Sequence, residues 1–559
     1  MPTRHLRLLS TLAAPAAALL LAGLPATAQA AAPAARTTAD HRDATVVSLR
    51  VSPTPAVVQV GSRTVDGTLV AGLADRRTAH FSMIGVTWDR ASGRDVSVEV
   101  RTRGARGWSD WTRLEVDPDN DASGTRAGTE PLWVDDATGV ATRVRSADTP
   151  PQGVKVVLVA PGTAPAGATT SADRTAAATT DGSPAYTPMP SLITRSQWGA
   201  RADSGCDSPR YGSETRGVIF HHTAGSNSYA RTDSQAIVRS TQAYHMQGRG
   251  WCDIGYNFLV DKYGQIFEGR SGGALLQVRG AHAGNYSVNT YDMGVSMIGN
   301  LDKVRPTTAM KNATVKLVGW RLGTNFLPAQ GAYAIAGHRL NRIAGHRDVY
   351  NAGIRPGTAT ACPGRYGYAW MKASGGLRDR VAAYIRDYTS AIKSETARLG
   401  HARTGDLNVG EYPTDGGRKA RFSYGDIYAK TPYGAHFVGG SVRTEYAAWD
   451  IEHGALGFPT TDILDVVAGK QAVQRYERGS IYRVPQSNGV NEAFGLTKGV
   501  DTKYRELGEF DSDLGAPTSR VNTAGGIDTA TFEHGRIDYD RATGVATVTF
   551  DAAAPVTEP

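Results

Sequence analysis

Alternating apolar and polar positions run through residues 45–160, with turn residues between the runs. Segments such as residues 96–100 (VSVEV) place their apolar side chains on one face of a strand. The pattern predicts an accessory all-β sandwich over residues 45–160. Trp108 and Trp111 lie between strand-like runs, where tryptophans pack in cores and hairpins or form sugar-binding platforms. The pattern leaves open whether this domain binds sugar, inhibits the rest of the chain or acts as a spacer.

The composition changes after this domain. Residues 160–184 contain no Val, Ile, Leu, Met or aromatic residue, so they cannot form a core. We therefore expect an extended linker rich in Ala, Thr and Pro over residues 161–189.

Strand-like and helix-like patterns are mixed in residues 190–400. Short apolar runs predict strands, two of them joined as a hairpin, and apolar positions at helical spacing predict helices. The expected strands are 217–220, 256–260, 265–268 and 293–298. The expected helices are 234–247, 308–322 and 377–392, the last with Gly400 past its end. This mixture predicts an α/β domain built on a sheet.

A pattern repeats three times in residues 401–550. Each copy has an aromatic residue, a glycine three positions later and an isoleucine two positions after that. The glycines are Gly425, Gly479 and Gly535. A second motif, LGFP at 456–459, is echoed by LGAP at 514–517. The spacing predicts hairpins with a turn glycine, stacked as a β-rich repeat array.

Composition and the N-terminus narrow the class of protein. The chain has 559 residues, of which 40% are hydrophobic and 20% charged, so it is not disordered throughout. Residues 1–30 combine a basic start, an apolar run and a small-residue cleavage site, and predict a signal peptide. We expect a secreted mature protein without a membrane span, with an uncleaved anchor as the alternative. The net charge is +8, and no Lys/Arg cluster with interleaved aromatic residues favours nucleic acid as a partner.

Two histidines and a cysteine carry the candidate chemistry. His221 and His222 directly follow the strand 217–220, His346 lies in a GHRDV segment, and Cys362 precedes Pro-Gly. A ligand at the end of a strand is held rigidly. Two His, one Cys and a water form an open zinc site of the catalytic kind. From the residues alone, a zinc site and core histidines beside a buried thiol both remain open.

The cysteine count bears on this choice. The chain has three cysteines, so one is left over if a disulfide forms in an oxidising compartment. Cys206 and Cys252 both lie in loops that lead to core strands. If these two form a disulfide, Cys362 is left available for a metal.

Six ordered motifs between residues 190 and 390 resemble those of peptidoglycan recognition proteins. They are ITRSQWGAR at 193–201, VIFHHTAG at 218–225, GWCDIGYNF at 250–258, GAHAG at 280–284, GHRDV at 345–349 and CPG at 362–364. This family shares its fold with bacteriophage-type N-acetylmuramoyl-L-alanine amidases. The resemblance implies a mixed central sheet flanked by helices, with a groove over one face.

The resemblance also implies roles for individual residues. It implies Zn²⁺ as the cofactor, with His221, His346 and Cys362 as ligands. Tyr256 matches the family's catalytic tyrosine, and Thr360 matches a position two residues before the cysteine that is expected beside the reaction. Four further residues are candidate substrate contacts in the groove, with plain packing as the alternative for the histidines: His222, His245, Asn257 and His282.

The resemblance therefore implies a zinc-dependent amidase that cleaves peptidoglycan between the lactyl group of N-acetylmuramic acid and L-Ala. Binding-only members of the family lack the cysteine ligand, which this chain keeps. The alternative is a non-catalytic protein that binds peptidoglycan at the cell wall. The C-terminal array resembles the LGFP repeats of secreted actinobacterial wall proteins, which implies association with the cell envelope. A third hypothesis makes this anchoring the main role and the amidase domain vestigial.

Overall fold

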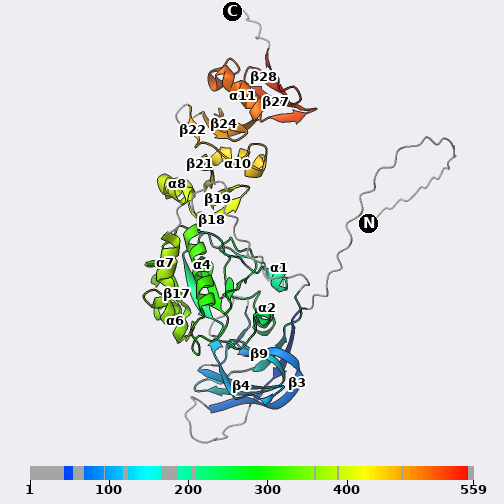
Figure 1. Ribbon diagram of the computed structural model, residues 1–559, viewed down its shortest axis with the longest axis vertical. Coiled ribbons are helices and arrows are strands. Elements are labelled where there is room, and N and C mark those ends of the chain that lie inside the picture. Colours follow the sequence, from blue (N-terminus) through cyan, green and yellow to red (C-terminus); the bar gives the residue numbers. More distant parts are fainter. Residues whose placement is uncertain are drawn as a thin grey trace, which may run out of the picture. The chain divides into compact units, whose positions relative to one another are not determined.

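The computed structural model describes residues 43–53, 68–93, 95–117, 124–164, 187–202, 209–357, 360–386, 390–466 and 471–551 (Figure 1). The predicted signal peptide, most of the predicted linker and Cys206 lie outside the described residues. Within these ranges, we find no helix with the length and apolar character that crossing a membrane would require.

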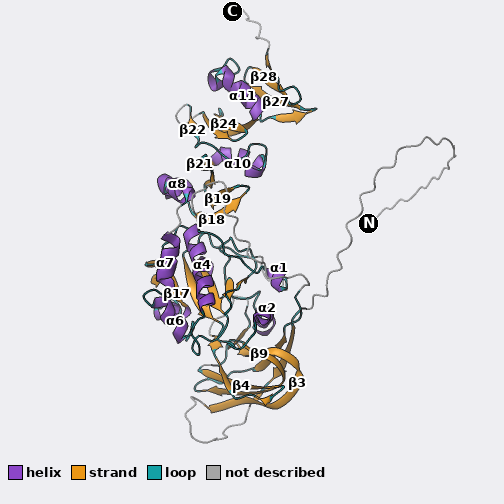
Figure 2. Ribbon diagram, viewed as in Figure 1, coloured by secondary structure: helices purple, strands orange, loops and turns teal. Residues whose placement is uncertain are grey.

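The described residues of 43–164, here called the β-domain, contain strands and no helix (Figure 2). The strands are β1 (Thr45–Arg50), β2 (Ser52–Pro53), β3 (Thr68–Asp89), β4 (Val96–Gly104), β5 (Gly107–Trp108), β6 (Thr112–Leu114), β7 (Val116–Asp117), β8 (Arg126–Thr129), β9 (Leu132–Ser146) and β10 (Lys155–Ala160). The main sheet order is β1-β10-β3-β9-β4-β5, and β8 joins β7 to β3. Alternate residues such as Ile84, Val86 and Val156 form the core, as the alternating pattern predicts. The expected all-β domain is confirmed.

Residues 187–386, here called the α/β domain, are built on a five-stranded sheet of order β13-β12-β14-β11-β17. Its strands are β11 (Gly217–His222), β12 (Phe258–Val260), β13 (Ile266–Glu268), β14 (Asp292–Met297) and β17 (Ile343–Gly345). β12, β14, β11 and β17 run parallel, and β13 pairs with β12 as an antiparallel hairpin. Every residue of β11 and β14 is buried, as is typical of parallel strands covered on both faces. The expected mixed sheet is confirmed.

Helices cover this sheet on both faces. The helices are α1 (Arg195–Trp198), η1 (Arg231–Asp233), α2 (Ser234–Ala243), η2 (Tyr244–Gly248), α3 (Tyr286–Tyr291), α4 (Thr308–Thr324), α5 (His346–Asn351), α6 (Arg365–Lys372) and α7 (Leu377–Arg386). Helices α4 and α7 lie side by side and pack with Phe220 and Met297 in one core cluster (Figure 1). Residues of α2 pack with Leu259 and Phe267 in a second cluster. A small hairpin, β15 (Ala332–Ile335) and β16 (His338–Asn341), adds to the domain.

The expected closing helix over 377–392 differs in the structure. Helix α7 ends at Arg386, and a separate helix, α8 (Ala391–Leu399), begins after Ser390, whose side chain caps it. The fully buried Ile392 of α8 packs against Phe422 and Ile427 of the first C-terminal repeat, whereas Val381 of α7 packs in the α/β core. The apolar spacing correctly predicts helix in both segments, but it cannot distinguish which core each segment covers.

The described residues of 390–551 form three four-stranded sheets, which confirms the expected β-rich repeats with hairpins. Their elements are α9 (His401–Thr404), β18 (Leu407–Thr414), β19 (Gly417–Phe422), β20 (Gly425–Lys430), β21 (Gly434–Gly439), α10 (Gly440–Ala448), η3 (Ile451–His453), β22 (Leu464–Asp465), β23 (Ala472–Tyr476), β24 (Gly479–Pro485), β25 (Asn491–Thr497), α11 (Lys498–Leu507), η4 (Glu509–Asp511), β26 (Asn522–Ala524), β27 (Ile527–Phe532), β28 (Gly535–Asp540) and β29 (Ala546–Phe550). The motif glycines Gly425, Gly479 and Gly535 each open the second strand of a hairpin. Gly479 and Gly535 have positive φ values of 154° and 155°, where a side chain would meet backbone.

Candidate metal centre

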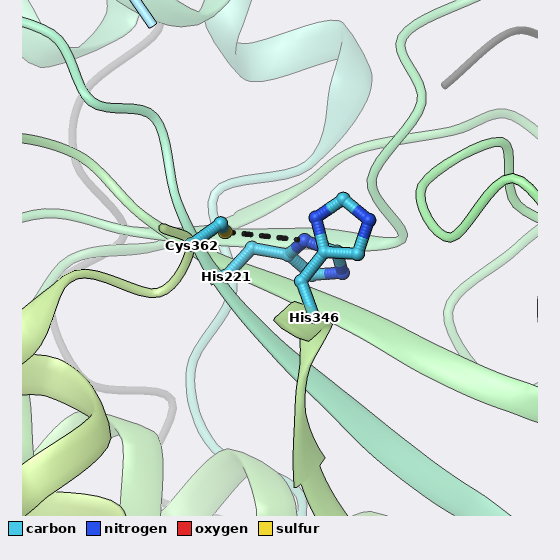
Figure 3. A group of neighbouring side chains, drawn as sticks. All are labelled: His221, His346 and Cys362. Carbon is cyan, nitrogen blue, oxygen red and sulfur yellow. Dashed lines mark hydrogen bonds between the residues drawn. The ribbon is translucent and has the colours of Figure 1, made fainter. Parts of the chain in front are cut away.

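Three side chains from separate elements meet at one end of the central sheet (Figure 3). His221 lies near the end of β11, and His346 follows the adjacent parallel strand β17 as the first residue of α5. Cys362 lies in the loop before α6. One potential ligand atom from each of the three side chains lies within 4.8 Å of the other two, and all three residues are buried. Because parallel strands end at the same edge, the chain brings distant residues together here.

The loop that carries Cys362 is held in place by its neighbours. Arg347, next to His346, donates hydrogen bonds from its backbone N and its Nε to the Cys362 carbonyl, at 3.1 and 3.3 Å. The backbone N of Cys362 donates to the Thr360 hydroxyl at 3.1 Å. Asp348 in turn accepts a hydrogen bond from the backbone N of Gly345 at 2.8 Å. The GHRDV segment thus positions both its own histidine and the cysteine.

The hydrogen bonds of His221 fix which of its nitrogens is free for a metal. The Nε2 of His282 lies 3.3 Å from the carbonyl oxygen of Asp292, which can only accept, so that nitrogen carries the proton. In the neutral ring, His282 Nδ1 is then an acceptor, and it lies 3.1 Å from His221 Nε2, which must donate to it. The lone pair of His221 is therefore on Nδ1, which lies 3.6 Å from Cys362 Sγ.

The charge states suit a metal. Burial lowers the pKa of His221 well below its usual value, and the neighbouring histidines lower it further, so the ring is neutral. Burial raises the pKa of the Cys362 thiol well above its usual value, and the carboxylates of Glu115 and Glu130 add to this effect. A metal ion would have to displace the thiol proton, as in other thiolate sites. Two imidazoles and one thiolate, one histidine oriented by a second hydrogen bond, fit zinc.

Tyr256 lies beside this group, just before β12. Its ring centroid is 5.4 Å from that of His221, and its side chain is 5% exposed. Burial raises the pKa of the Tyr256 hydroxyl well above its usual value, so the hydroxyl is a hydrogen-bond donor. Tyr256 and the histidines border a small cavity with a volume of about 10 Å³. The residues that line it are Asp117, Glu130, His221, Trp251, Tyr256, Ala281, His282 and His346.

The other predicted groove residues have different surroundings. The Nδ1 of His222 accepts a hydrogen bond from Leu301 N at 3.1 Å, so the ring proton is on Nε2. This Nε2 donates to Glu115 Oε2, which is also 3.1 Å away. His245 packs on Trp251 with ring centroids 4.5 Å apart. The Asn257 amide bonds to backbone at both ends, to Val278 O and Gly294 N. None of these three lines the small cavity.

The acidic residues of the site could not be recognised from the sequence. Glu115, Asp117 and Glu130 come from the β-domain and lie against the α/β domain. No motif marks them, because a carboxylate in a strand-rich segment is ordinarily a solvated surface residue. The predicted disulfide between Cys206 and Cys252 stays a prediction, because Cys206 lies outside the described residues.

Comparison with known families matches three parts of the chain. Residues 211–365 match the family model described as N-acetylmuramoyl-L-alanine amidase. Residues 30–179 match the model described as Rv3811 N-terminal galactose-binding domain-like, and residues 408–454 match the LGFP repeat.

Similar proteins and structures match the middle part. Peptidoglycan recognition protein 1 of Bos taurus is 37% identical over 150 residues, which are 27% of this chain and 74% of that protein. Peptidoglycan-recognition protein SC1a of Drosophila melanogaster is 34% identical over 150 residues, 26% of this chain and 75% of that protein. The structure of Drosophila PGRP-LB wild-type is 30% identical and covers 33% of this chain and 92% of its own, with a TM-score of 0.26. The chain belongs to the peptidoglycan recognition protein family and carries an amidase-type domain and LGFP repeats.

Proposed function

We propose that this protein is a zinc-dependent N-acetylmuramoyl-L-alanine amidase that hydrolyses the amide bond between the lactyl group of N-acetylmuramic acid and L-Ala in peptidoglycan. The observation that carries the proposal is the buried group of His221, His346 and Cys362, whose ligand atoms lie within 4.8 Å of one another. Tyr256 lines the same small cavity as the two histidines. The retained Cys362 favours this over a binding-only protein, because a non-catalytic groove needs no thiolate.

Each residue has a distinct part in the proposed reaction. His221, His346 and Cys362 would hold the zinc ion, which, when bound, supplies a water of lowered pKa and an electrophile for the substrate carbonyl. His282 keeps the proton of His221 on Nε2 and so leaves Nδ1 for the metal. The Tyr256 hydroxyl, once released from Glu130, would donate a hydrogen bond to the carbonyl oxygen as negative charge develops there. Thr360, whose hydroxyl accepts from Cys362 N, would contribute a second, weaker hydrogen bond.

We further propose that the protein is secreted and that its repeats hold it at the cell envelope. The predicted signal peptide and the matched LGFP repeat support this localisation. No specific observation favours the third hypothesis, in which anchoring is the main role and the amidase domain is vestigial, because all three proposed ligands are present and lie together.

The proposal is tested by incubating the protein with purified peptidoglycan and assaying newly freed L-Ala amino groups, with and without a zinc chelator. We expect release that the chelator abolishes and added Zn²⁺ restores. Tyr256→Phe should bind the same amount of zinc but lose about 10²- to 10³-fold in rate, the usual cost of removing one such donor. Cys362→Ser should lose both zinc and activity. If no L-Ala is released while the protein still sediments with the wall, the binding-only alternative is correct.

A further inference from the structure

The β-domain places two glutamate side chains over the proposed catalytic centre. Glu115 lies between β6 and β7, and Glu130 lies between β8 and β9. The backbone N of Glu130 donates a hydrogen bond to the carbonyl of Glu115 at 2.8 Å, which fixes the two residues beside each other. Neither residue belongs to the chain segment that matches the amidase family model.

These two carboxyl groups accept hydrogen bonds from the two hydroxyls that the proposed reaction needs as donors. The Tyr256 hydroxyl donates to Glu130 Oε1 at 3.0 Å, and the Thr360 hydroxyl donates to Glu115 Oε1 at 2.9 Å. Burial and the charges of Asp117 and Glu115 raise the pKa of Glu130 well above its usual value, so Glu130 is a neutral carboxyl group. A hydroxyl that already donates to either carboxyl group cannot at the same time donate to an oxyanion of the substrate. The other oxygen of Glu130 is buried at this cavity and has no hydrogen-bond partner among the described residues.

The cavity that the described residues form at His221 and His346 is too small for a substrate. The cavity of about 10 Å³ is bordered by Asp117 and Glu130 of the β-domain as well as by the histidines. A volume of this size holds about one water molecule. A muramyl peptide could reach the ligand group only if the β-domain moved away.

The contact between the domains is extensive and includes a buried ion pair. Arg249 Nη1 of the α/β domain lies 2.7 Å from Asp117 Oδ2 of the β-domain, with side-chain exposures of 0% and 7%. Apolar residues of both domains share one core cluster, with Met83 and Val157 on one side and Ile237 and Tyr244 on the other. The shared apolar cluster and the buried ion pair hold the two domains in one specific arrangement.

From these contacts we propose that the β-domain is a built-in inhibitor of the groove, which it closes by binding Tyr256 and Thr360 through Glu130 and Glu115. This inference rests on the proposed function of the groove. The described structure is then the closed, inactive form, and turnover depends on the fraction of molecules in which the β-domain has left the groove.

Two variants weaken the contact without altering a proposed zinc ligand or Tyr256. Asp117→Ala leaves the Arg249 charge buried without its Asp117 partner in the closed form, whereas opening returns that charge to water. Gly85→Val places a side chain against the Tyr244 ring, because a Cβ at Gly85 would lie 2.3 Å from Tyr244 Cε2. Both changes raise the free energy of the closed form, the first through an uncompensated buried charge and the second through a steric overlap.

Two matched controls make the same chemical changes away from the contact. Asp75→Ala removes a carboxylate that pairs with Arg101 within the β-domain, at 2.5 Å. Gly104→Val fills a position where the nearest atom to a new Cβ is Asp136 O of the same domain, 3.3 Å away. We expect both controls to match the wild type.

The full-length variants are compared in two assays, L-Ala release from purified peptidoglycan and co-sedimentation with it, each corrected for the folded fraction by circular dichroism. We expect Asp117→Ala and Gly85→Val to raise release at least tenfold, which corresponds to about 1.4 kcal/mol in the closing equilibrium, and to raise sedimentation.

The two assays separate the inhibitor proposal from the amidase proposal. If all five proteins release L-Ala at the same rate, the inhibitor proposal is overturned and the amidase proposal stands. If both variants sediment more strongly but release nothing, the groove is occluded as proposed and the amidase proposal fails. Lower release by the two variants than by the wild type would instead make the β-domain a part of the working active site, and would also overturn the inhibitor.

Discussion

The His221 ring shows how a residue outside the proposed ligand set can orient a proposed metal ligand. Its Nε2 is held by His282 at 3.1 Å, and His282 is itself oriented by the backbone carbonyl of Asp292. This chain of donors and acceptors selects one tautomer for each ring. The sequence motif GAHAG marks His282 as a residue of interest, but only the structure shows that its partner is His221 rather than the substrate.

We therefore expect His282→Leu to weaken zinc binding by about 10- to 100-fold, the usual effect of losing such a partner of a metal ligand. His221 would then lack the acceptor that keeps its proton on Nε2. Competition with a chromophoric chelator measures the affinity. His338→Leu is the matched control, because His338 is exposed on β16 and should leave the affinity unchanged. Equal zinc affinity of His282→Leu and the wild type would exclude this orienting role.

At the scale of elements, strand β14 begins with an ionisable side chain in the interior. Asp292 is fully buried, accepts a hydrogen bond from the Tyr333 hydroxyl through Oδ1, and has no hydrogen-bond partner at Oδ2 among the described residues. Burial raises the pKa of Asp292 to about 7. In the unfolded chain the pKa of an aspartate is about 3.9. The folded state therefore binds a proton more tightly than the unfolded state.

This difference predicts how stability depends on pH. The stabilising effect of the bound proton is fully present below about pH 4 and is lost as the pH rises through about 7. Asp292→Asn stays neutral at every pH, so its thermal midpoint should fall less than that of the wild type between pH 5 and pH 8. The full effect is on the order of 4 kcal/mol, at about 1.4 kcal/mol per pKa unit. Thermal unfolding at a series of pH values measures it, with the exposed Asp110→Asn as the control. Parallel curves for Asp292→Asn and the wild type would contradict the prediction.

Single helices and strands can be predicted from the sequence, whereas the core that each of them covers cannot. Strand β11 and helix α4 follow from apolar runs and spacing, because such periodic patterns report burial directly. The position of His221 after a core strand follows as well. The strand β17 before His346 was not predicted, and the ligand roles of both histidines come from the family resemblance and stay a prediction. The division of the closing helix into α7 and α8 does not follow, since Val381 and Ile392 are equally apolar and differ only in the core that they enter.

At the scale of the whole molecule, the contact between the β-domain and the groove could not be predicted from local patterns. Glu115 and Glu130 contact residues more than a hundred positions away in the chain. Periodicity within either segment carries no information on such pairing, and the acidic side chains look like ordinary surface residues. From the sequence, inhibition is one of three possible roles for the β-domain. The hydrogen bonds from Tyr256 and Thr360 to Glu130 and Glu115 favour this role over the other two.

The packing of α8 predicts where the chain can be cut. We expect a chain that ends at Arg386 to keep α7 in the α/β core, whereas a chain that ends at Gly400 would leave Ile392 of α8 without its partners Phe422 and Ile427. Limited trypsin digestion with mass spectrometry should find rapid cleavage within α8 in the longer truncation and protection of the same segment in the full chain. Equal protection of α8 in both chains would show that α8 is stabilised by the α/β domain instead.

The covalent link between the β-domain and the groove has a consequence for dilution. A separate inhibitor protein leaves its target when both are diluted, because binding depends on concentration. An inhibitor within the same chain has a fixed effective concentration, set by the connecting residues. Dilution into a large volume would therefore leave the closed fraction of this protein unchanged. Only an event that acts on the molecule itself, such as a competing ligand for the groove or a cut in the chain before Ile193, would release it.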